Sequence, residues 1–223
     1  MSQPEPGSAA ETYEKYFVPA MFVPWADILL RHASPQPGER VLDVACGTGI
    51  VARLAAPLVG SKGQAVAVDV NPAMLAVARA HPAPSDATIH WQEGNAVALP
   101  FPDGAFDMVL CQHGLQFIPD RASAVREMRR VLAPGGRALV IVLQALARHP
   151  VFETLVESAS RHLSLPISAV LPRSLSEMFL YPSSWPKDAA GPVESSFVPF
   201  HEVPGKRLRG FPRAPTGPTG FYV

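Results

Sequence analysis

The sequence predicts an α/β fold in which helices cover both faces of a doubly wound, mostly parallel sheet. Between residues 39 and 163, short runs of apolar, often β-branched residues alternate with segments of helical periodicity. Strands buried on both faces have this continuous apolar character, and parallel strands need helical crossovers between them. A glycine turn follows the first apolar run and an aspartate ends the second. This pattern is typical of a ligand site at the carboxyl ends of parallel strands.

The expected elements follow from apolar periodicity and from proline, glycine and asparagine punctuation. Pro19 and Pro24 are expected to break the first helix into pieces. Asn71 followed by Pro72 is typical of a helix start, because asparagine caps the free N–H groups and proline fits the first turn. Residues 134–136, Pro-Gly-Gly, are expected to form a turn. The expected strands are residues 40–45, 64–70, 88–92, 106–111 and 137–143, and the expected helices are residues 11–32, 50–59, 72–80, 120–132 and 150–163.

Composition restricts the function classes. The 223 residues include 19 basic and 19 acidic side chains, so the formal net charge is zero, and neither nucleic acid nor an anionic membrane is expected as a partner. The longest apolar run, residues 138–147, is interrupted by Gln144 and is too short to span a bilayer. Cys46 and Cys111 have no metal-type spacing, and residues 1–17 lack a signal-peptide pattern. We therefore expect a cytoplasmic protein without a metal site.

The glycine turn and the aspartate that ends the second strand together indicate a site for an adenosine-containing cofactor. Gly47 and Gly49 let the backbone approach a ligand closely, and Asp69 can accept two hydrogen bonds from ribose hydroxyls. The turn also fits the dinucleotide pattern G-x-G-x-x-G/A, so an NAD(P)-dependent oxidoreductase is an alternative interpretation. Asp43, within the first strand, argues against a pyrophosphate but suits a sulfonium cofactor that bears an amino group.

Four ordered segments carry a resemblance to a known family: VLDVACGTG, VDVNPAML, GNAVALPFPDGAFDMVLC and REMRRVLAPGGRALV. The chain resembles, over roughly residues 11–177, the S-adenosylmethionine-dependent methyltransferases of the type 11 or UbiE-like group. The resemblance implies a Rossmann-like methyltransferase fold. It also implies S-adenosyl-L-methionine as cofactor and an unidentified, small-molecule methyl acceptor.

The resemblance also assigns roles to residues around the methionine end of the cofactor. It places Asp43 and the turn Ala45, Cys46, Gly47, Thr48 and Gly49 there, together with Cys111 and Gln112 at the end of the fourth strand. The N-terminal segment Tyr13 to Phe17, represented by Tyr16, is expected to help close the site. Ala45 stands where the family usually has glycine.

Around the adenosine end, the resemblance assigns the ribose hydroxyls to Asp69. It places Val70 and Met74 beside the adenine, and Asn95 and Ala96 at its edge. Asn95 stands where aspartate is usual, and an amide oxygen accepts a hydrogen bond more weakly than a carboxylate.

Other polar side chains have competing interpretations. His113, just after the fourth strand, is the candidate general base for deprotonating the acceptor, although a packing or substrate-lining role is the alternative. Cys46 has no evident base nearby, so a small buried side chain is favoured over a nucleophile. Arg126, Arg129 and Arg130 are expected to lie on the solvated face of a helix.

The C-terminal region departs from the family. We divide the chain into a flexible N-terminus (residues 1–10), a methyltransferase domain (11–177) and an irregular tail rich in proline and glycine (178–223). The tail lacks alternating apolar runs long enough for the antiparallel hairpin that usually completes the sheet. We therefore expect the fifth strand to be an exposed edge that allows self-association. A cofactor-binding domain with impaired catalysis is a further alternative.

Overall fold

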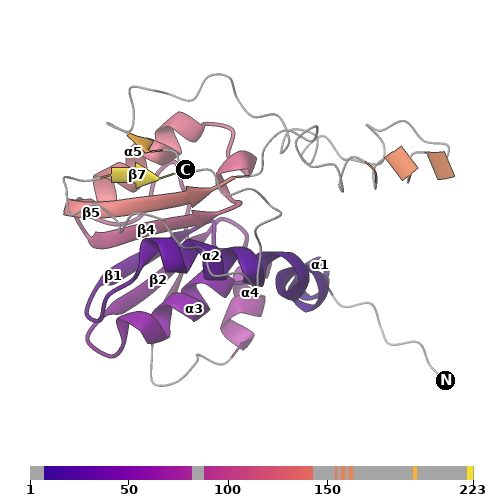
Figure 1. Ribbon diagram of the computed structural model, residues 1–223, viewed down its shortest axis with the longest axis horizontal. Helices are drawn as coiled ribbons and strands as arrows, with labels where there is room; N and C mark the ends of the chain where they lie inside the picture. Colours follow the sequence, from indigo (N-terminus) through magenta and orange to yellow (C-terminus); the bar gives the residue numbers. More distant parts are fainter. Residues whose placement is uncertain are drawn as a thin grey trace, which may run out of the picture.

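The computed structural model describes residues 8–81 and 88–142, isolated helical residues at 154, 157–158 and 161–162, and two short strands near the C-terminus. Figure 1 shows a sheet with helices on both sides. The helices are α1 (Ala9–Thr12), η1 (Tyr13–Phe22), α2 (Val23–Ala33), α3 (Ile50–Val59), α4 (Pro72–Ala80), η2 (Leu115–Phe117) and α5 (Arg121–Val131). The strands are β1 (Arg40–Val44), β2 (Gln64–Asp69), β3 (Ile89–Glu93), β4 (Phe106–Gln112), β5 (Leu132–Ile141), β6 (Val193–Glu194) and β7 (Gly220–Tyr222).

The sheet confirms the predicted doubly wound topology. Its strand order is β3-β2-β1-β4-β5-β7-β6, and every strand pairing within the described residues is parallel. The chain moves outward in one direction from β1 to β3 and then returns to β4 on the other side of β1. The strand order therefore reverses between β1 and β4, where a sheet of this type opens a crevice at its carboxyl edge.

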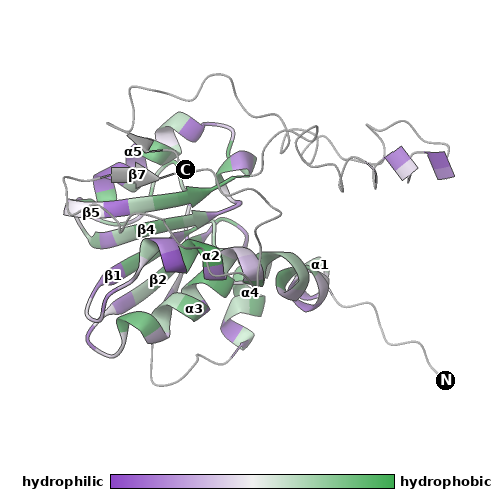
Figure 2. Cartoon of the chain, viewed as in Figure 1, coloured by the Kyte–Doolittle hydropathy of each residue, from purple (hydrophilic) through white to green (hydrophobic). Residues whose placement is uncertain are grey.

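Alternate residues of each strand face two different hydrophobic cores. Val41, Met108 and Leu110 pack with α2 and α3, whereas Leu42 and Val109 pack with α5 on the opposite face. The small side chains of β2 pack against α3 and α4. Figure 2 shows hydrophobic residues along the central strands and along the helices in front of them. Burial on both faces explains why these strands are continuous apolar runs in the sequence.

The N-terminal helix accommodates its prolines instead of breaking. A capping box between Ser8 and Glu11 starts α1, and the chain continues without a gap through η1 into α2. Pro19 lies inside η1, which has π-helical geometry, and Pro24 lies in the first turn of α2. Proline has no backbone N–H group to donate. The π-helical segment accommodates the missing hydrogen bond at Pro19, and at Pro24 the first turn of a helix has no intrahelical acceptor for that N–H group. The expected breaks are therefore a local change of helix type.

The prediction that a turn at residues 134–136 precedes the fifth strand is wrong. Strand β5 already begins at Leu132, and Gly135 keeps a positive φ of 80° within it. The pairing of β4 with β5 is irregular between Phe106 and Met108, so the Pro-Gly-Gly segment forms an irregularity inside a longer strand.

The edge of β5 is partly covered. Strand β7 pairs with Arg137, Ala138 and Leu139 of β5, and β6 pairs with β7. The expectation of a fully exposed β5 edge is therefore wrong for these three residues, because β7 supplies their neighbour. The two tail strands that the structure describes pair in parallel, and the expected lack of an antiparallel closing hairpin stays a prediction. Most of the expected helix 150–163 and of the tail 178–223 lies outside the described residues, and self-association stays a prediction.

Candidate functional site

The turn between β1 and α3 lies at the point where the strand order reverses. Three of its residues have positive φ angles: 55° at Ala45, 56° at Gly47 and 85° at Gly49. Such angles are easily adopted by glycine and cost about 1 kcal/mol for other residues. The turn thus fits the close backbone approach to a ligand that the sequence predicted, with strain at Ala45.

Asp69, at the end of β2, holds the turn from the neighbouring strand. Its Oδ2 accepts a hydrogen bond from the Gly47 backbone N–H at 2.7 Å, and its Oδ1 accepts one from the Asn71 N–H at 2.8 Å. A carboxylate has about four acceptor positions. Asp69 can therefore hold the turn and still accept from two ligand hydroxyls.

Asp43 is a buried acid beneath the same turn. Its side chain is 1% exposed, and its Oδ2 accepts a hydrogen bond from the Ala52 N–H at 3.0 Å. The pKa of Asp43 is raised to about 8, mainly by burial and to a smaller extent by the nearby charge of Asp69. A buried carboxyl of this kind favours a cationic partner, because a positive charge would stabilise its ionised form.

The pH dependence of Asp43 can be tested directly. Because its folded-state pKa is raised above the unfolded value, its contribution to stability is full below about pH 4 and is lost as pH rises towards 8. Replacing Asp43 by asparagine keeps an acceptor for Ala52 but removes the ionisation. We expect D43N to flatten the dependence of the free energy of unfolding on pH between 5 and 8, measured by urea denaturation. Identical pH profiles for D43N and the unchanged protein would contradict this expectation.

Gly47 and Gly49 face different surroundings. A Cβ atom added at Gly47 would meet only the Tyr13 ring, at 3.9 Å from its hydroxyl oxygen. A Cβ atom added at Gly49 would lie 2.3 Å from the Trp91 indole, which is far inside contact distance. Gly47 therefore leaves space between the turn and the Tyr13 ring, whereas Gly49 allows the β3 tryptophan to pack against α3.

The N-terminal helix places Tyr13 over this turn. The Tyr13 ring packs against Phe22 and Phe17 at centroid distances of 5.1 and 6.3 Å. Burial raises the pKa of Tyr13, and the charges of Glu14, Asp69 and Asp43 raise it further, so the hydroxyl stays protonated and can donate a hydrogen bond. Tyr16, the tyrosine named from the sequence, is 59% exposed, with Lys15 over its ring.

Glu14 fastens the same helix to α3. Its Oε1 pairs with Nη2 of Arg53 at 2.7 Å, and Nη1 of Arg53 donates to the Thr48 carbonyl oxygen at 2.7 Å. The Glu14 side chain is 13% exposed. This link was not foreseen from the sequence, because Glu14 and Arg53 belong to helices far apart in the chain.

The end of β4 contributes Cys111, Gln112 and His113. The Gln112 side-chain NH₂ donates to the Phe22 carbonyl oxygen at 2.9 Å, while its buried Oε1 has no partner within the described residues. His113 has a φ of 53°, its N–H donates to the Ile141 carbonyl oxygen, and its ring contacts Phe22 and Trp25 edge-on. The strand end thus presents polar groups among aromatic rings. A catalytic role for His113 stays a prediction.

Both cysteines are buried. Burial raises the pKa of Cys111 to about 12 and that of Cys46 well above its ordinary value. Protonated, inaccessible thiols are poor nucleophiles, which favours the packing interpretation of both side chains.

The adenosine side of the expected site is more open. Val70 is 67% exposed and Met74 is partly buried at the start of α4. Asn95 accepts a hydrogen bond from the Val97 N–H at 3.1 Å through its side-chain oxygen, and Ala96 is buried. The Asn95 oxygen has a second lone pair, so a further hydrogen bond from a ligand is chemically available.

Ala45 and Gly114 form a tightly fitted pair between the ends of β1 and β4. A Cβ atom at Gly114 would lie 2.5 Å from the Ala45 Cβ and 3.2 Å from the Cys111 Sγ. The position that carries alanine in place of the usual glycine is thus matched by a glycine on the neighbouring strand end.

This fit predicts an energetic coupling. Gly114→Ala is expected to destabilise the protein by about 1–3 kcal/mol through overpacking. In an Ala45→Gly background the same change should cost clearly less, because the closest contact has been removed. Urea denaturation of the four proteins measures the coupling. Equal costs in the two backgrounds would show that the two positions are independent.

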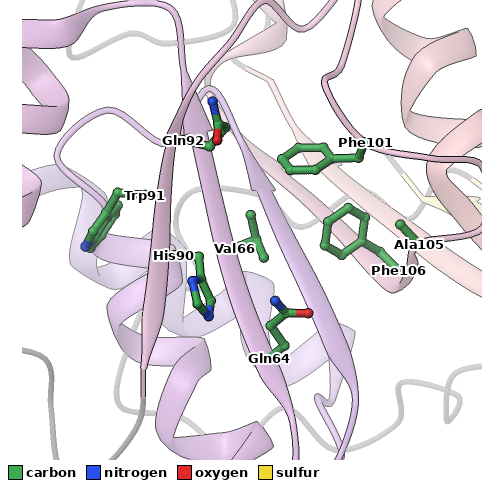
Figure 3. A pocket seen from close by; sticks show the side chains of 8 residues that line it. All are labelled: Gln64, Val66, His90, Trp91, Gln92, Phe101, Ala105 and Phe106. Atoms are coloured by element: carbon green, nitrogen blue, oxygen red, sulfur yellow. The ribbon is translucent and has the colours of Figure 1, made fainter.

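A separate pocket of about 400 Å³ lies between β2, β3 and the segment that precedes β4. Figure 3 shows Gln64, Val66, His90, Phe101 and Phe106 around it, with Trp91 across the β3 ribbon. It is not lined by the turn or by Asp43 and Asp69. Within the described residues no group of His, Cys, Asp and Glu could hold a metal ion, and no helix is long and apolar enough to cross a membrane.

Comparisons with known proteins agree with this geometry. A family model described as a methyltransferase domain matches residues 42–140. The 2-phytyl-1,4-naphtoquinone methyltransferase of Synechococcus elongatus is 43% identical over 119 residues, which are 52% of this chain and 51% of that protein. The ubiquinone/menaquinone biosynthesis C-methyltransferase UbiE of Shewanella sediminis is 40% identical over 119 residues, covering 52% and 47% of the two chains. The chain thus spans about half the length of these relatives.

Solved structures confirm the fold. A chain from Methanococcus maripaludis, described as an S-adenosyl-L-methionine-dependent methyltransferase, has a TM-score of 0.53 at 19% identity and covers 73% of this chain and 75% of its own length. A chain in complex with the Trm112 methyltransferase activator of Haloferax volcanii has a TM-score of 0.55 at 20% identity and covers 74% and 70%. None of these comparisons favours the oxidoreductase alternative. Over residues 42–140, this chain is therefore similar to methyltransferase domains in sequence, and it shares their fold.

Proposed function

We propose that this chain binds S-adenosyl-L-methionine and transfers its methyl group to a small-molecule acceptor. The observation that carries the proposal is the pair of acids around the glycine turn. Asp69 offers free acceptor positions to ribose hydroxyls, and buried Asp43 can ionise and supply a negative charge when a cationic group binds beside it. An NAD pyrophosphate would meet unfavourable charge at the same place.

The residues present fit this cofactor. A Cβ atom at Gly47 would face Tyr13 and no closer atom, so the glycine leaves a face of the turn open. The buried Oε1 of Gln112 has no partner within the described residues and suits a donor such as the methionine ammonium group. The methionine end of the cofactor would be held by Asp43 and Gln112, and its ribose by Asp69. Tyr13 would cover the turn. The adenine would be bordered by Val70, Met74, Asn95 and Ala96. Cys46, Thr48 and Cys111 shape the strand ends.

The bound cofactor supplies an electrophilic methyl group on a sulfonium leaving group. Asp43, Asp69 and Gln112 would hold this methyl group in line with the acceptor atom, and the covering helix would exclude water. Phe22, Trp25 and His113 provide aromatic surfaces near the end of β4, and His113 is the candidate to take the proton.

We further propose that the acceptor carries a quinone-type aromatic ring and that the protein acts in the cytoplasm. The names of the relatives from Synechococcus and Shewanella support the first point. The two free, buried cysteines support the second, because reducing compartments keep thiols unpaired.

Labelled methyl transfer tests the function. The protein is incubated with methyl-labelled S-adenosylmethionine and, separately, a reduced naphthoquinone, a reduced benzoquinone and a cell extract. Label in a small-molecule fraction, lost in the D69A variant, is the expected result. Binding of S-adenosylhomocysteine without any transfer would favour the catalytically impaired alternative. Lack of such binding would refute the proposed function.

A further inference from the structure

Arg130 does not lie on a solvated helix face, as the sequence suggested. Arg126 and Arg129 are exposed, whereas the Arg130 side chain is 30% exposed and turned towards the segment between β3 and β4. Nη2 of Arg130 donates to the Leu99 carbonyl oxygen at 3.0 Å, and Nη1 donates to the Phe101 carbonyl oxygen at 2.8 Å. The α5 helix therefore satisfies backbone carbonyls of a segment that lies outside any helix or strand.

Glu127 completes the contact one turn earlier on α5. Its two oxygens accept from Nε and Nη2 of Arg130, each at 2.7 Å, and its Oε2 also accepts from the Leu99 N–H at 2.8 Å. Hydrogen bonds from Arg130 hold the pKa of the Glu127 carboxyl below its usual range, so it stays ionised at neutral pH. The Leu99 N–H is thus bound by Glu127, and the Leu99 carbonyl oxygen is bound by Arg130.

The five N–H groups of Arg130 are all used. Two bond to Glu127, two to the Leu99 and Phe101 carbonyls, and one to Oδ1 of Asp103 at 2.8 Å. The planar fork of a guanidinium fixes these directions, and a lysine has only three donors at one point. A lysine at this position could keep the charge but not the arrangement.

The segment held in this way, residues 94–105, begins at the expected adenine edge. Gly94 donates to the Asp69 carbonyl oxygen at 3.0 Å, and Asn95 and Ala96 follow it. The bonds within the segment are short-range, such as Ala98 N–H to the Asn95 carbonyl at 3.0 Å. Its position relative to the sheet is therefore set by the two strands at its ends, by the burial of Ala96 and Leu99 in the core and by the polar contact with α5.

We propose that the Glu127–Arg130 pair is a positioning device that holds Asn95 and Ala96 at the adenine and so sets selectivity for the adenosyl group. The inference rests on the proposed function. Neither residue touches the cofactor. Both act through the backbone of Leu99 and Phe101.

The test compares Arg130→Lys with Arg129→Lys, a matched change on the same helix at an exposed position. Calorimetry measures binding of S-adenosylhomocysteine and of S-inosylhomocysteine, in which an oxygen replaces the adenine amino group. The unchanged protein should prefer the adenosyl ligand by about tenfold, which is the worth of one well-placed hydrogen bond. R130K should lose most of that preference, and R129K should keep it.

Amide hydrogen exchange on the ligand-free protein provides a second readout. The Leu99 amide should exchange at least about tenfold faster in R130K than in R129K, because its acceptor Glu127 is no longer held. Unchanged ligand selectivity or unchanged Leu99 exchange in R130K would overturn the proposal. If the unchanged protein bound no S-adenosylhomocysteine, the proposed function would fail, and the exchange measurement would still decide whether the pair orders this segment.

Discussion

Alanine at Gly49 is expected to destabilise the fold, whereas alanine at Gly47 is expected to weaken cofactor binding in a folded protein. At Gly49 the new Cβ would collide with the Trp91 ring, and the alanine would have to adopt the backbone φ of 85° that the glycine has. Overpacking and the strained φ together predict a loss of about 2–4 kcal/mol. At Gly47 the loss of stability should be only about 1 kcal/mol, because the space towards Tyr13 is open.

For cofactor binding we expect the opposite order, with the larger loss of affinity at Gly47. The added methyl group at Gly47 points to the side of the turn where Tyr13 lies, so G47A should bind S-adenosylhomocysteine at least about tenfold more weakly. Urea denaturation and calorimetry on both variants separate the two effects. A Gly49→Ala, Trp91→Leu double variant is the control, and it should cost less than the sum of its single changes. Wild-type stability of G49A would show that Trp91 does not constrain this position.

Asp69→Ala should cost about 1–3 kcal/mol of binding free energy, roughly 5- to 150-fold in dissociation constant. Two ribose hydroxyls would lose their acceptor, and the Gly47 and Asn71 N–H groups would lose theirs. Asp69→Asn keeps one acceptor oxygen for the turn, so it should bind more tightly than the alanine variant.

Calorimetry with S-adenosylhomocysteine measures this effect, and Asp27→Ala, at an exposed position on α2, is the control. The control variant should bind like the unchanged protein. Equal affinity of D69A and D27A would place the ribose site elsewhere.

Local signals predicted the elements that lie next to the site. Glycines at 49 and 60 bound α3, and Asn71 with Pro72 starts α4, so both helices begin where the sequence indicated. These signals act within a few residues and need no knowledge of the fold. The same holds for Asp43 and Asp69, because strand periodicity places them at the carboxyl edge.

Long-range contacts could not be predicted in this way. The sequence does not distinguish Arg130 from its solvated neighbours, because its hydrogen-bond partners between β3 and β4 are some thirty positions away in the chain. Tyr13 and Tyr16 are close in sequence, and only the packing of the N-terminal helix brings Tyr13 against the turn. The covering of β5 by β7 depends equally on tertiary pairing, because a three-residue strand has no periodic signal of its own.

The pairing of β5 with β7 has a consequence for the order of folding. Strands β1 to β5 join through short crossovers, whereas Leu139 must find Tyr222 across a long stretch of chain. The entropy cost of closing a loop grows with its length, and three residues of strand pairing return little in exchange. We expect the β1–β5 sheet to form first and β7 to dock late, with local unfolding of β7 the easiest opening of the sheet.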